Sequence, residues 1–558
     1  MRHPLILSIA LIPALAVGCV RPARLAADLV ITNARIWTGD ALQPDANAVA
    51  VIGDRIVDVG SSREIDRWRG AATTVIDAEG RRVLPGFNDA HVHLIDGGTA
   101  LDNVNLKDAA TPAEFTRRIA ERAKTKPGEW ILGGEWDDQR WTPAELPTRH
   151  LIDDVTNGTP VFVTRYDGHM ALANSTALGR AGVTEITPDP PGGAIVRDAN
   201  GFPTGVLKDA AMEFVARVIP KMTPDARLAV VKRALRYAAS VGVTSLQDMN
   251  PSYDDIGVYA ELANRNELTA RIYAAPLELG WYDQAKLGVH RSFGSPWLRI
   301  GAVKGYADGS LGSTTAYFFQ PYTDAPQTRG LLSDEMQPID DMRIRLMAAD
   351  HAGLQLCMHA IGDAGISATL DLYADVIRAN GGRDRRLRIE HAQHIAPKDF
   401  ERFAAMNVIA SVQPYHAIDD GRWAERRIGP ERIKTTYAFR TLIDKGVRLA
   451  FGTDWTVAPL NPMLTLYAAT TRATLDGAHP DGWVPEQKIS ITEAVQAYTS
   501  GSAFAEFQDT VKGTIVRGKI ADLIILSDDV FSIPAARLKD VQVLTTVAGG
   551  KVVHQRRP

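Results

Sequence analysis

The sequence predicts an α/β protein built on a (β/α)8 TIM-like barrel. Between residues 83 and 455, short apolar runs rich in β-branched residues alternate with segments of helical periodicity, a pattern typical of parallel barrel strands and their helices. Alternating strand patterns at the two ends of the chain indicate a separate small sheet unit. With 558 residues, the chain is long enough for a barrel with additional units.

The two ends of the chain are expected to fold together. Residues 28–84 contain runs such as DLVITNARIW and AVAVIGDRIVDVG, and residues 513–556 contain KIADLIILSDD and VLTTVAGGKVVHQ. Each set is too small to be stable alone. We therefore predict that they pair into one composite β-sandwich, and that residues 85–505 form the barrel.

Eight runs can be assigned as barrel strands, with the limits 83–93, 243–249, 271–277, 298–308, 354–362, 387–394, 408–414 and 448–455. The gap between the first two is much longer than one crossover helix, which predicts a cap insertion at residues 100–222. Within the insertion, Thr111-Pro112-Ala113-Glu114 predicts a capped helix start. A β-hairpin is expected around residues 199–201.

Composition and charge exclude several classes of protein. A hydrophobic fraction of 45% and a charged fraction of 23% exclude a disordered chain. The 62 basic and 66 acidic residues give a net charge of -4 without a basic stripe, so nucleic acid is not an expected partner. Two cysteines, Cys19 and Cys357, are too few for a disulfide framework, and Cys357 is expected to be a small buried thiol.

Residues 1–19 have the pattern of an export signal. Arg2 and His3 precede an apolar run at residues 5–17 that is too short to span a bilayer comfortably. The run ends in LAVGC, which resembles a bacterial lipobox with Cys19 as the lipidated residue. We therefore expect a lipoprotein on the periplasmic side of the cell envelope, held to the membrane only by this anchor. Cleavage to a soluble periplasmic protein and an uncleaved N-terminal anchor remain open.

Histidines and one acidic residue lie at the ends of several predicted strands. His91 and His93 are two positions apart, so their side chains point to the same side of the first strand. His359, His391 and Asp454 lie near the ends of the fifth, sixth and eighth strands. Because barrel strands bring their carboxyl ends to one rim, these five side chains predict a metal site. Imidazoles and a carboxylate suit zinc, with a coordination position left for water.

Several motifs together resemble the amidohydrolase superfamily, specifically the amidohydrolase-3 branch that includes N-substituted formamide deformylase. They are GFNDAHVH, VKGYADGSLGSTTA, CMHAIGDAG, RIEHAQH and FGTDW, and the resemblance extends over nearly all of residues 28–556. It implies that His91, His93 and Asp454 hold one metal ion and that His359 and His391 hold another. It also implies that Lys304 bridges the two ions as an N-carboxylated lysine.

The chemistry of Lys304 agrees with that implication. The fourth strand directs Lys304 to the same face as Ala302, and if that face is interior, an ammonium would be repelled by the metal ions. A carbamate formed with carbon dioxide offers one oxygen to each ion instead. The expected cofactor is thus two Zn²⁺ ions, with another divalent metal possible. The alternative is an ordinary ammonium paired with Asp308 or Asp454 beside a single metal ion.

The resemblance implies hydrolysis of a non-peptide C–N bond in a small amide or formamide. Two zinc ions would lower the pKa of a bridging water, and Asp454 would accept its proton and deliver it to the leaving nitrogen. The nearest alternative is a hydrolase or deaminase of the same superfamily that acts on a cyclic amide, a lactone or an ester. A catalytically silent binding barrel is a more remote alternative.

Residues on predicted loops and strand ends around the barrel mouth could contact substrate, although packing explains each of them equally well. These candidates are Trp136, Tyr166, His169, Asp308 and His416. His394, three residues after His391, could equally support a ligand, be structural or take part in the chemistry.

Overall fold

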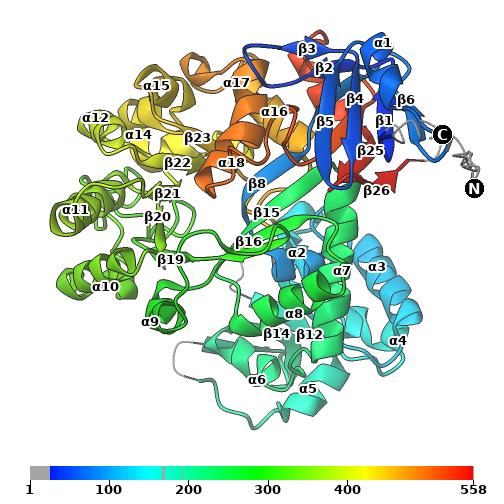
Figure 1. Cartoon of the computed structure of the whole chain (residues 1–558). Helices are drawn as coiled ribbons and strands as arrows, with labels where there is room; N and C mark the ends of the chain where they lie inside the picture. Colours follow the sequence, from blue (N-terminus) through cyan, green and yellow to red (C-terminus); the bar gives the residue numbers. More distant parts are fainter. Residues whose placement is uncertain (1–24, 166–169, 191–192, 557–558) are drawn as a thin grey trace, which may run out of the picture.

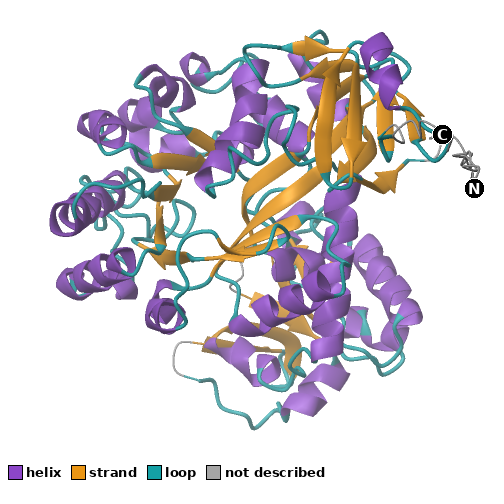
Figure 2. Ribbon diagram, in the orientation of Figure 1, coloured by secondary structure: helices purple, strands orange, loops and turns teal. Residues whose placement is uncertain are grey.

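The computed structural model describes residues 25–165, 170–190 and 193–556 (Figure 1). The predicted export segment 1–19 and the candidate residues Tyr166 and His169 lie outside the described residues. Helices and strands are interspersed along the chain (Figure 2), which confirms the predicted α/β class. Within the described ranges, no helix combines the length and apolarity needed to cross a bilayer.

Strands from the middle of the chain form two five-stranded sheets, in the orders β17-β18-β16-β15-β8 and β19-β20-β21-β22-β23. All neighbouring strands are parallel except β17 and β18. Isolated parallel bridges, Val92 with Trp455 and Leu277 with Lys304, connect one sheet to the other. The strands are β8 (Phe87–Val92), β15 (Val243–Met249), β16 (Arg271–Ala275), β17 (Phe293–Gly294), β18 (Leu298–Ile300), β19 (Ala302–Tyr306), β20 (Gln355–Ala360), β21 (Arg388–His391), β22 (Ile409–Val412) and β23 (Leu449–Phe451).

Helices follow most of these strands along the chain, and α10, α11 and α12 lie on the outer side of β20–β22 (Figure 1). The helices of this region are α2 (Leu94–Ala100), α7 (Pro224–Ser240), α8 (Tyr253–Asn264), α9 (Trp281–Lys286), α10 (Ile339–His351), α11 (Asp363–Asn380), α12 (Phe400–Ala405), α13 (Pro414–Asp420), α14 (Ala424–Arg432), α15 (Phe439–Asp444), α16 (Pro462–Thr471), α17 (Ile491–Gln496) and α18 (Ser502–Ala505).

Strands from the two ends of the chain pair in one six-stranded sheet, β26-β25-β24-β7-β2-β3, in which β24 runs antiparallel to β7. A four-stranded sheet, β5-β4-β1-β6, shares an apolar cluster with it, including Ile31 and Ile525. The elements are β1 (Leu29–Thr32), β2 (Arg35–Trp37), β3 (Asp45–Ala46), β4 (Ala48–Ile52), β5 (Arg55–Gly60), α1 (Ser62–Ile65), β6 (Thr74–Asp77), β7 (Arg82–Pro85), β24 (Leu523–Leu526), β25 (Val543–Ala548) and β26 (Lys551–Gln555).

A third unit lies between β8 and β15, where a cap insertion was expected. Its sheet has the order β13-β14-β12-β11-β10-β9. Thr111 caps α3 by accepting a hydrogen bond from the Glu114 N–H at 3.2 Å, and β13 pairs antiparallel with β14, so the predicted helix start and hairpin are confirmed. The elements are β9 (Val104–Asn105), α3 (Pro112–Thr125), β10 (Gly133–Trp136), α4 (Asp153–Thr156), β11 (Phe162–Arg165), β12 (Met170–Ala173), α5 (Ser175–Ala181), β13 (Gly193–Arg197), β14 (Pro203–Asp209) and α6 (Glu213–Ala216).

Two of the predicted barrel strands are divided by a glycine. The run 83–93 is split at Gly86 into β7 and β8, which belong to different sheets, and the run 298–308 is split at Gly301 into β18 and β19. A Cβ atom at Gly86 would lie 2.3 Å from the hydroxyl of Thr244, and one at Gly301 would lie 2.0 Å from the carbonyl oxygen of His290. The prediction of continuous strands was wrong at both places. Another segment approaches each glycine too closely for a side chain, and Gly301 has a φ of +107°, which is outside the strand region.

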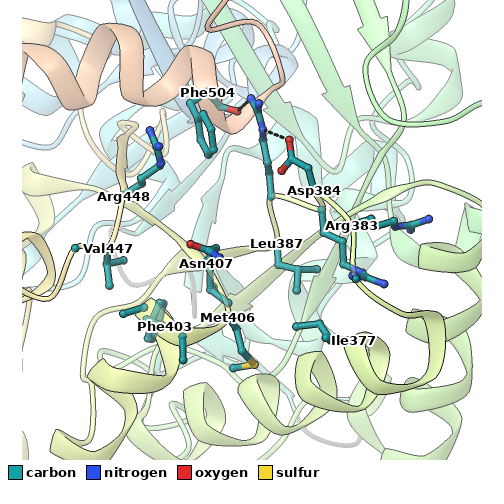
Figure 3. A pocket seen from close by; sticks show the side chains of 17 residues that line it. Ile377, Arg383, Asp384, Leu387, Phe403, Met406, Asn407, Val447, Arg448 and Phe504 are labelled. Carbon is teal, nitrogen blue, oxygen red and sulfur yellow. Dashed lines mark hydrogen bonds and ion pairs between the residues drawn. The ribbon is translucent and has the colours of Figure 1, made fainter.

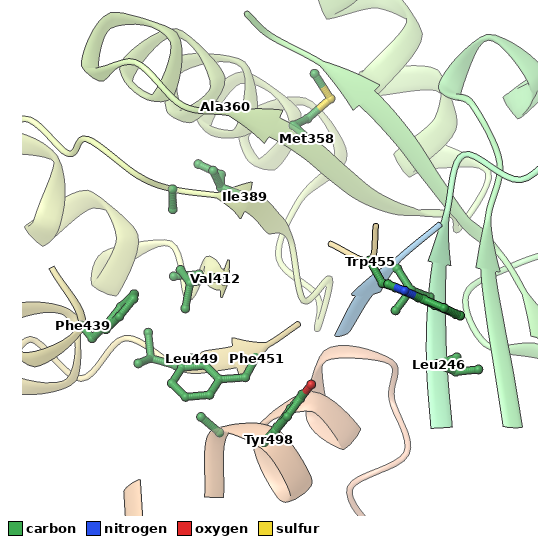
Figure 4. Close-up of a cluster of buried hydrophobic side chains, with 14 of the residues drawn as sticks. Leu246, Met358, Ala360, Ile389, Val412, Phe439, Leu449, Phe451, Trp455 and Tyr498 are labelled. Carbon is green, nitrogen blue, oxygen red and sulfur yellow. The ribbon is translucent and has the colours of Figure 1, made fainter. Parts of the chain in front are cut away.

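Apolar side chains between the central strands and their helices form a large buried cluster (Figure 4). Ile389 of β21 and Val412 of β22 belong to it and are fully buried. Removing each such side chain from water contributes about 1.5–3 kcal/mol. Because side chains alternate along a strand, their neighbours Glu390 and Ser411 face the opposite side, between the two sheets. Packing in this cluster therefore holds β21 and β22 in place, with the polar side chains of Glu390 and Ser411 on their other face.

Candidate metal centre

The end of β8 places His91 and His93 beside Asp454. The Nε2 atoms of His93 and His91 lie 3.1 Å and 3.5 Å from Asp454 Oδ1. The backbone N–H of Asp454 donates to the carbonyl oxygen of His91 at 2.7 Å, so the residues that follow β23 are held against β8. Asp454 has a φ of +57°. This left-handed conformation is uncommon for residues other than glycine, although asparagine, aspartate and histidine adopt it more readily than the rest.

His391 and His416 reach the same carboxylate from the other side. His391 ends β21 with a φ of +72°, and its Nδ1 lies 4.0 Å from Asp454 Oδ2 and 3.0 Å from Gln413 Oε1. Possible ligand atoms of His391, His416 and Asp454 lie within 4.8 Å of one another, as do those of His91, His93 and Asp454. The Nε2 atom of His416 is buried without a hydrogen-bond partner among the described residues, which suits a ligand position.

His359 lies close to these histidines but belongs to neither group of three. Its ring centroid is 4.5 Å from that of His391, and its Nε2 lies 3.1 Å from the carbonyl oxygen of Gly309. The assignment of His359 to a second metal therefore stays a prediction. The presence of His416 in a ligand group was not expected from the sequence, which placed it among the substrate contacts.

Lys304 on β19 points into the same group of side chains. It is 1% exposed, and its Nζ lies 3.3 Å from the Nε2 atom of His91. Burial, the strongest influence, lowers its pKa. In the described part of the chain, no carboxylate oxygen lies within 4 Å of this Nζ. The pairing with Asp308 or Asp454 that the sequence left open is therefore not observed.

Glu390 and Arg388 support the centre through His91, and neither was identified from the sequence. Glu390 Oε2 lies 2.8 Å from His91 Nδ1, and Arg388 contacts both oxygens of Glu390, at 2.8 and 3.1 Å. Both side chains are fully buried. Charged residues at alternate positions of a strand in a buried parallel sheet are unusual. That alternation in the sequence RIEH is the signal that could have revealed them.

Burial sets the protonation of the ring nitrogens. It lowers the pKa of His91 to about 4 and that of His359 to about 3, with a further contribution from the charge of Lys304, and it lowers the pKa of His391 well below its usual value. His93 is the exception, because its contact with Asp454 outweighs burial and raises its pKa. Burial raises the pKa of Asp454, but the surrounding imidazoles outweigh this and keep it well below the usual range. Mainly neutral imidazoles around an ionised carboxylate are what a divalent metal such as zinc requires.

A cavity of about 430 Å³ opens over these residues. Tyr306, two positions after Lys304 on β19, lines it. The hydroxyl oxygen of Tyr306 accepts a hydrogen bond from Asn250 Nδ2 at 2.9 Å, and Asn250 Oδ1 lies 3.0 Å from His93 Nδ1. Tyr306 was missed in the sequence, although its spacing from Lys304 puts it on the same strand face.

The remaining candidates differ in their positions. Trp136 is fully buried in the core of the β9–β14 sheet, where its Nε1–H donates to the carbonyl oxygen of Val163 at 2.9 Å, so it packs within that unit and does not line the cavity. Asp308 does not line the cavity either, because its carboxylate accepts the N–H groups of three loop residues, including Ile361 and Gly362 at 2.9 and 2.8 Å. Cys357 is a buried thiol, as expected.

The chain is similar to known proteins over most of its length. It is 39% identical to Protein LONG AFTER FAR-RED 3 of Arabidopsis thaliana, covering 96% of this chain and 92% of that protein. It is 29% identical to N-substituted formamide deformylase of Arthrobacter pascens, covering 95% and 98%. The crystal structure of an uncharacterised metal-dependent hydrolase from Pyrococcus horikoshii OT3 superposes with a TM-score of 0.76 at 28% identity, covering 91% and 99%. Residues 74–554 match the amidohydrolase family, and this chain therefore belongs to that family.

Proposed function

We propose that this protein is a metal-dependent hydrolase that cleaves the non-peptide C–N bond of a small amide or formamide. The observation that carries the proposal is the convergence of imidazoles and the Lys304 amine about the Asp454 carboxylate beneath one cavity. Similarity to N-substituted formamide deformylase over nearly the full length of both chains supports the reaction class. Similarity to a metal-dependent hydrolase supports the need for metal.

The donor set fits one or two divalent metal ions. His91, His93 and Asp454 would hold the first, and His391 with His359 or His416 would hold the second. Zinc is the metal we propose, because neutral imidazoles and a carboxylate suit it. When bound, the metal supplies a Lewis acid that polarises a carbonyl group and lowers the pKa of water.

The protein's own residues would move the protons and position the substrate. Asp454, ionised at neutral pH, is placed to accept a proton from water and pass it to the leaving nitrogen, which departs readily only when protonated. The hydroxyl of Tyr306 accepts from Asn250, which leaves its hydrogen free to be donated to the carbonyl oxygen of a substrate. Glu390 holds the ring of His91 in place.

Metal analysis together with turnover of a panel of formamides, amides, lactones and esters tests this function. Asp454→Asn is expected to abolish most turnover, and His91→Ala to lose metal as well, whereas Asp444→Asn, an exposed aspartate on α15, serves as the control. Turnover of only lactones, esters or cyclic amides would favour the alternative superfamily activity. Full metal content without turnover of any class would favour a binding protein.

We also propose that Lys304 is N-carboxylated. Its Nζ lies among histidines, where an ammonium would repel metal ions and a carbamate would bind them. Lys304→Ala should therefore lose activity, which high concentrations of acetate or propionate should partly restore. Bicarbonate should accelerate reconstitution with zinc. One zinc per chain and no bicarbonate effect would contradict the bridge.

We also propose that the protein is exported and anchored through Cys19. The support is the pattern of residues 1–19, with a basic start, an apolar run and a lipobox-like end. Metabolic lipid labelling and membrane fractionation should find labelled protein in the envelope fraction. Unlabelled protein in the cytoplasm would contradict export, and unlabelled protein in the periplasm would contradict only the lipid anchor.

We further infer that the two five-stranded sheets belong to one (β/α)8 barrel. The bridges from Val92 to Trp455 and from Leu277 to Lys304 support this arrangement, because they join β8 to the segment after β23 and the segment after β16 to β19. In the same proposal, residues 28–84 and 513–556 form the composite sandwich, and residues 100–222 form the cap.

A further inference from the structure

Two cavities at opposite ends of the central strands differ in the charge of their walls. The segments that precede β21, β22 and β23 border a cavity of about 470 Å³, whose charged lining residues are four arginines and one aspartate (Figure 3). The cavity over the candidate metal centre is acidic instead. Besides its histidines, its charged lining residues are Lys304, Asp419, Asp420 and Asp454. Because Asp454 is a candidate metal ligand, Asp419 and Asp420 are the carboxylates left to meet a substrate.

Of these two carboxylates, that of Asp420 has no cationic partner. Asp419 pairs with the guanidinium group of Arg422, which balances its charge. For Asp420, no basic nitrogen lies within 4 Å in the part of the chain that the structure describes. Its side chain is half-buried, and burial raises its pKa to about 7. A positive charge beside this carboxylate would stabilise its ionised form.

Buried residues hold the carboxylate of Asp420 in one orientation. The hydroxyl of Tyr437 donates to Asp420 Oδ2 at 2.6 Å, and Gln393 Nε2 donates to the hydroxyl oxygen of Tyr437. Tyr437 and Gln393 are 1% and 4% exposed, so this support is packed in the interior. Asp420 Oδ1 accepts no hydrogen bond from the described residues, and it is not among their enclosed atoms. One oxygen therefore fixes the group, and the other is accessible to a ligand.

The helix α13 sets the distance between this carboxylate and the candidate metal centre. His416 and Asp420 are four residues apart on α13, so their side chains lie on the same face, and both line the cavity. At 1.5 Å per residue, the two positions are separated by about 6 Å along the helix. A substrate whose carbonyl group lies at the candidate metal centre would thus meet Asp420 at its far end.

An aromatic ring lies beside Asp420 in the same cavity. The backbone N–H of Trp423 donates to the carbonyl oxygen of Asp420 at 2.9 Å, and the half-buried side chain of Trp423 lines the cavity. A Cβ atom at Gly312 would lie 3.8 Å from Trp423 Cη2, so the ring reaches the loop after β19 that forms another part of the wall. Aromatic rings attract cations, and carboxylates form strong charge-assisted hydrogen bonds with ammonium groups.

We infer that Asp420 and Trp423 form a subsite for a cationic nitrogen of the substrate. On the proposed function, on which this inference rests, the substrate is an amide or formamide that carries an alkylammonium group about 6 Å from its carbonyl group. Val457, which is 61% exposed and lines the cavity, offers apolar surface to the hydrocarbon chain between the two groups.

The test uses two matched pairs of compounds with the metal-loaded full-length protein. N-(4-aminobutyl)formamide and N-pentylformamide have the same length and end in an ammonium or a methyl group, and the corresponding methanesulfonamides resist hydrolysis. In titration calorimetry, the charged methanesulfonamide should bind about tenfold or more tightly than the neutral one, as expected for a charge-assisted contact. The ratio of kcat/KM for the two formamides should show the same preference.

Variants assign the preference to the subsite. Asp420→Asn keeps an oxygen for Tyr437 but loses the charge, so it should reduce the preference about tenfold or more. Trp423→Leu should reduce it several-fold. Asp444→Asn, at an aspartate whose side chain is 61% exposed, is the matched control and should keep the wild-type preference. Metal content is measured for each variant, and if Asp420→Asn loses metal, Trp423→Leu decides the test.

The outcomes separate the subsite from the proposed reaction. Equal affinity of the wild type for the two methanesulfonamides, or a preference that persists in both Asp420→Asn and Trp423→Leu, would overturn the inference. Turnover of N-pentylformamide would then still support the proposed function. A preference in calorimetry that Asp420→Asn removes, without turnover of either formamide, would support the subsite and contradict the proposed reaction.

Discussion

The ring of His91 is fixed at both of its nitrogens. Its Nδ1 contacts the carboxylate of Glu390, so its Nε2 is left toward Asp454 and Lys304. A carboxylate behind a ligating histidine sets the tautomer and makes the other nitrogen a better ligand. Arg388 in turn neutralises Glu390 and keeps its pKa low, against the effect of burial. Glu390 is thus a positioning residue that acts through His91.

Glu390→Gln tests this positioning. The amide keeps the size of the side chain but loses the charge, so metal affinity is expected to fall about 10- to 100-fold. Competition with a chelator of known affinity measures the effect, and Glu425→Gln, an exposed glutamate on α14, is the control. If Glu390→Gln retains wild-type metal affinity with reduced activity, the role assigned to Glu390 in metal binding is wrong.

His394 is buried and is not a predicted metal ligand, so it can test how burial affects the protonation of a histidine. Its Nδ1 lies 2.8 Å from the hydroxyl of Thr436, which itself donates to the carbonyl oxygen of Arg432, so Nδ1 carries the proton. Burial lowers the pKa of His394 to about 3. An unfolded histidine titrates near 6.5, so between about pH 6.5 and 3 the unfolded state binds a proton that the folded state does not. The contribution of His394 to stability is therefore present above pH 6.5 and is lost as the pH falls.

The variant His394→Gln should remove this pH dependence. Its unfolding free energy relative to wild type should rise by up to about 1.4 kcal/mol for each pH unit below 6.5. Denaturant titrations at several pH values measure the difference, with His351→Gln, which replaces an exposed imidazole, as the control. A pH-independent difference between wild type and His394→Gln would mean that the buried imidazole titrates normally.

The residues of the candidate site were predictable from the sequence to different degrees. His91, His93 and Asp454 could be placed together because strand ends converge on one rim, and the structure brings them within contact. Strict alternation would have put Glu390 and His391 on opposite faces, but the left-handed backbone of His391 turns both toward the site. Trp136 lies in a core because β10 pairs with β11, a long-range contact that local pattern does not reveal.

At the scale of elements, one buried carboxylate joins β8 to the segment after β23. Asp89 accepts hydrogen bonds from the N–H and hydroxyl of Thr453, at 3.0 and 2.8 Å, and from the hydroxyl of Tyr498 at 2.7 Å. Asp89 is fully buried. Because Thr453 directly precedes Asp454, this contact sets where the candidate ligand carboxylate meets His91.

Tyr498→Phe removes one of these three bonds without changing the packed ring. It is expected to lower the unfolding free energy by about 1–3 kcal/mol, because a buried acceptor loses a partner. Chemical denaturation measures this, and Tyr282→Phe, at a 55% exposed tyrosine, is the control. Equal stability of Tyr498→Phe and wild type would show that Asp89 finds another donor.

At the same scale, the sequence predicted which elements exist better than where they end. The strand, helix and hairpin patterns at β15, α3 and β13–β14 were found because each is a local signal. The breaks at Gly86 and Gly301 could not be seen, since they depend on Thr244 and on His290, which approach from other parts of the chain.

At the scale of the whole molecule, the candidate metal ligands connect the two central sheets. His91 belongs to the sheet that contains β8, whereas Lys304 and His391 belong to the sheet that contains β19 to β23.

A bound ion would therefore tie together segments far apart in the sequence, and removing it with a chelator should lower the melting temperature. Binding at a free metal concentration 100 times the dissociation constant stabilises the folded state by about 2.7 kcal/mol. The unfolding entropy of a chain of this length is large, so a fall of about 2 °C is expected, and added zinc should reverse it. Differential scanning calorimetry measures the change. His91→Ala should melt at nearly the same temperature with and without chelator, and an equal fall in both proteins would place the stabilising metal elsewhere.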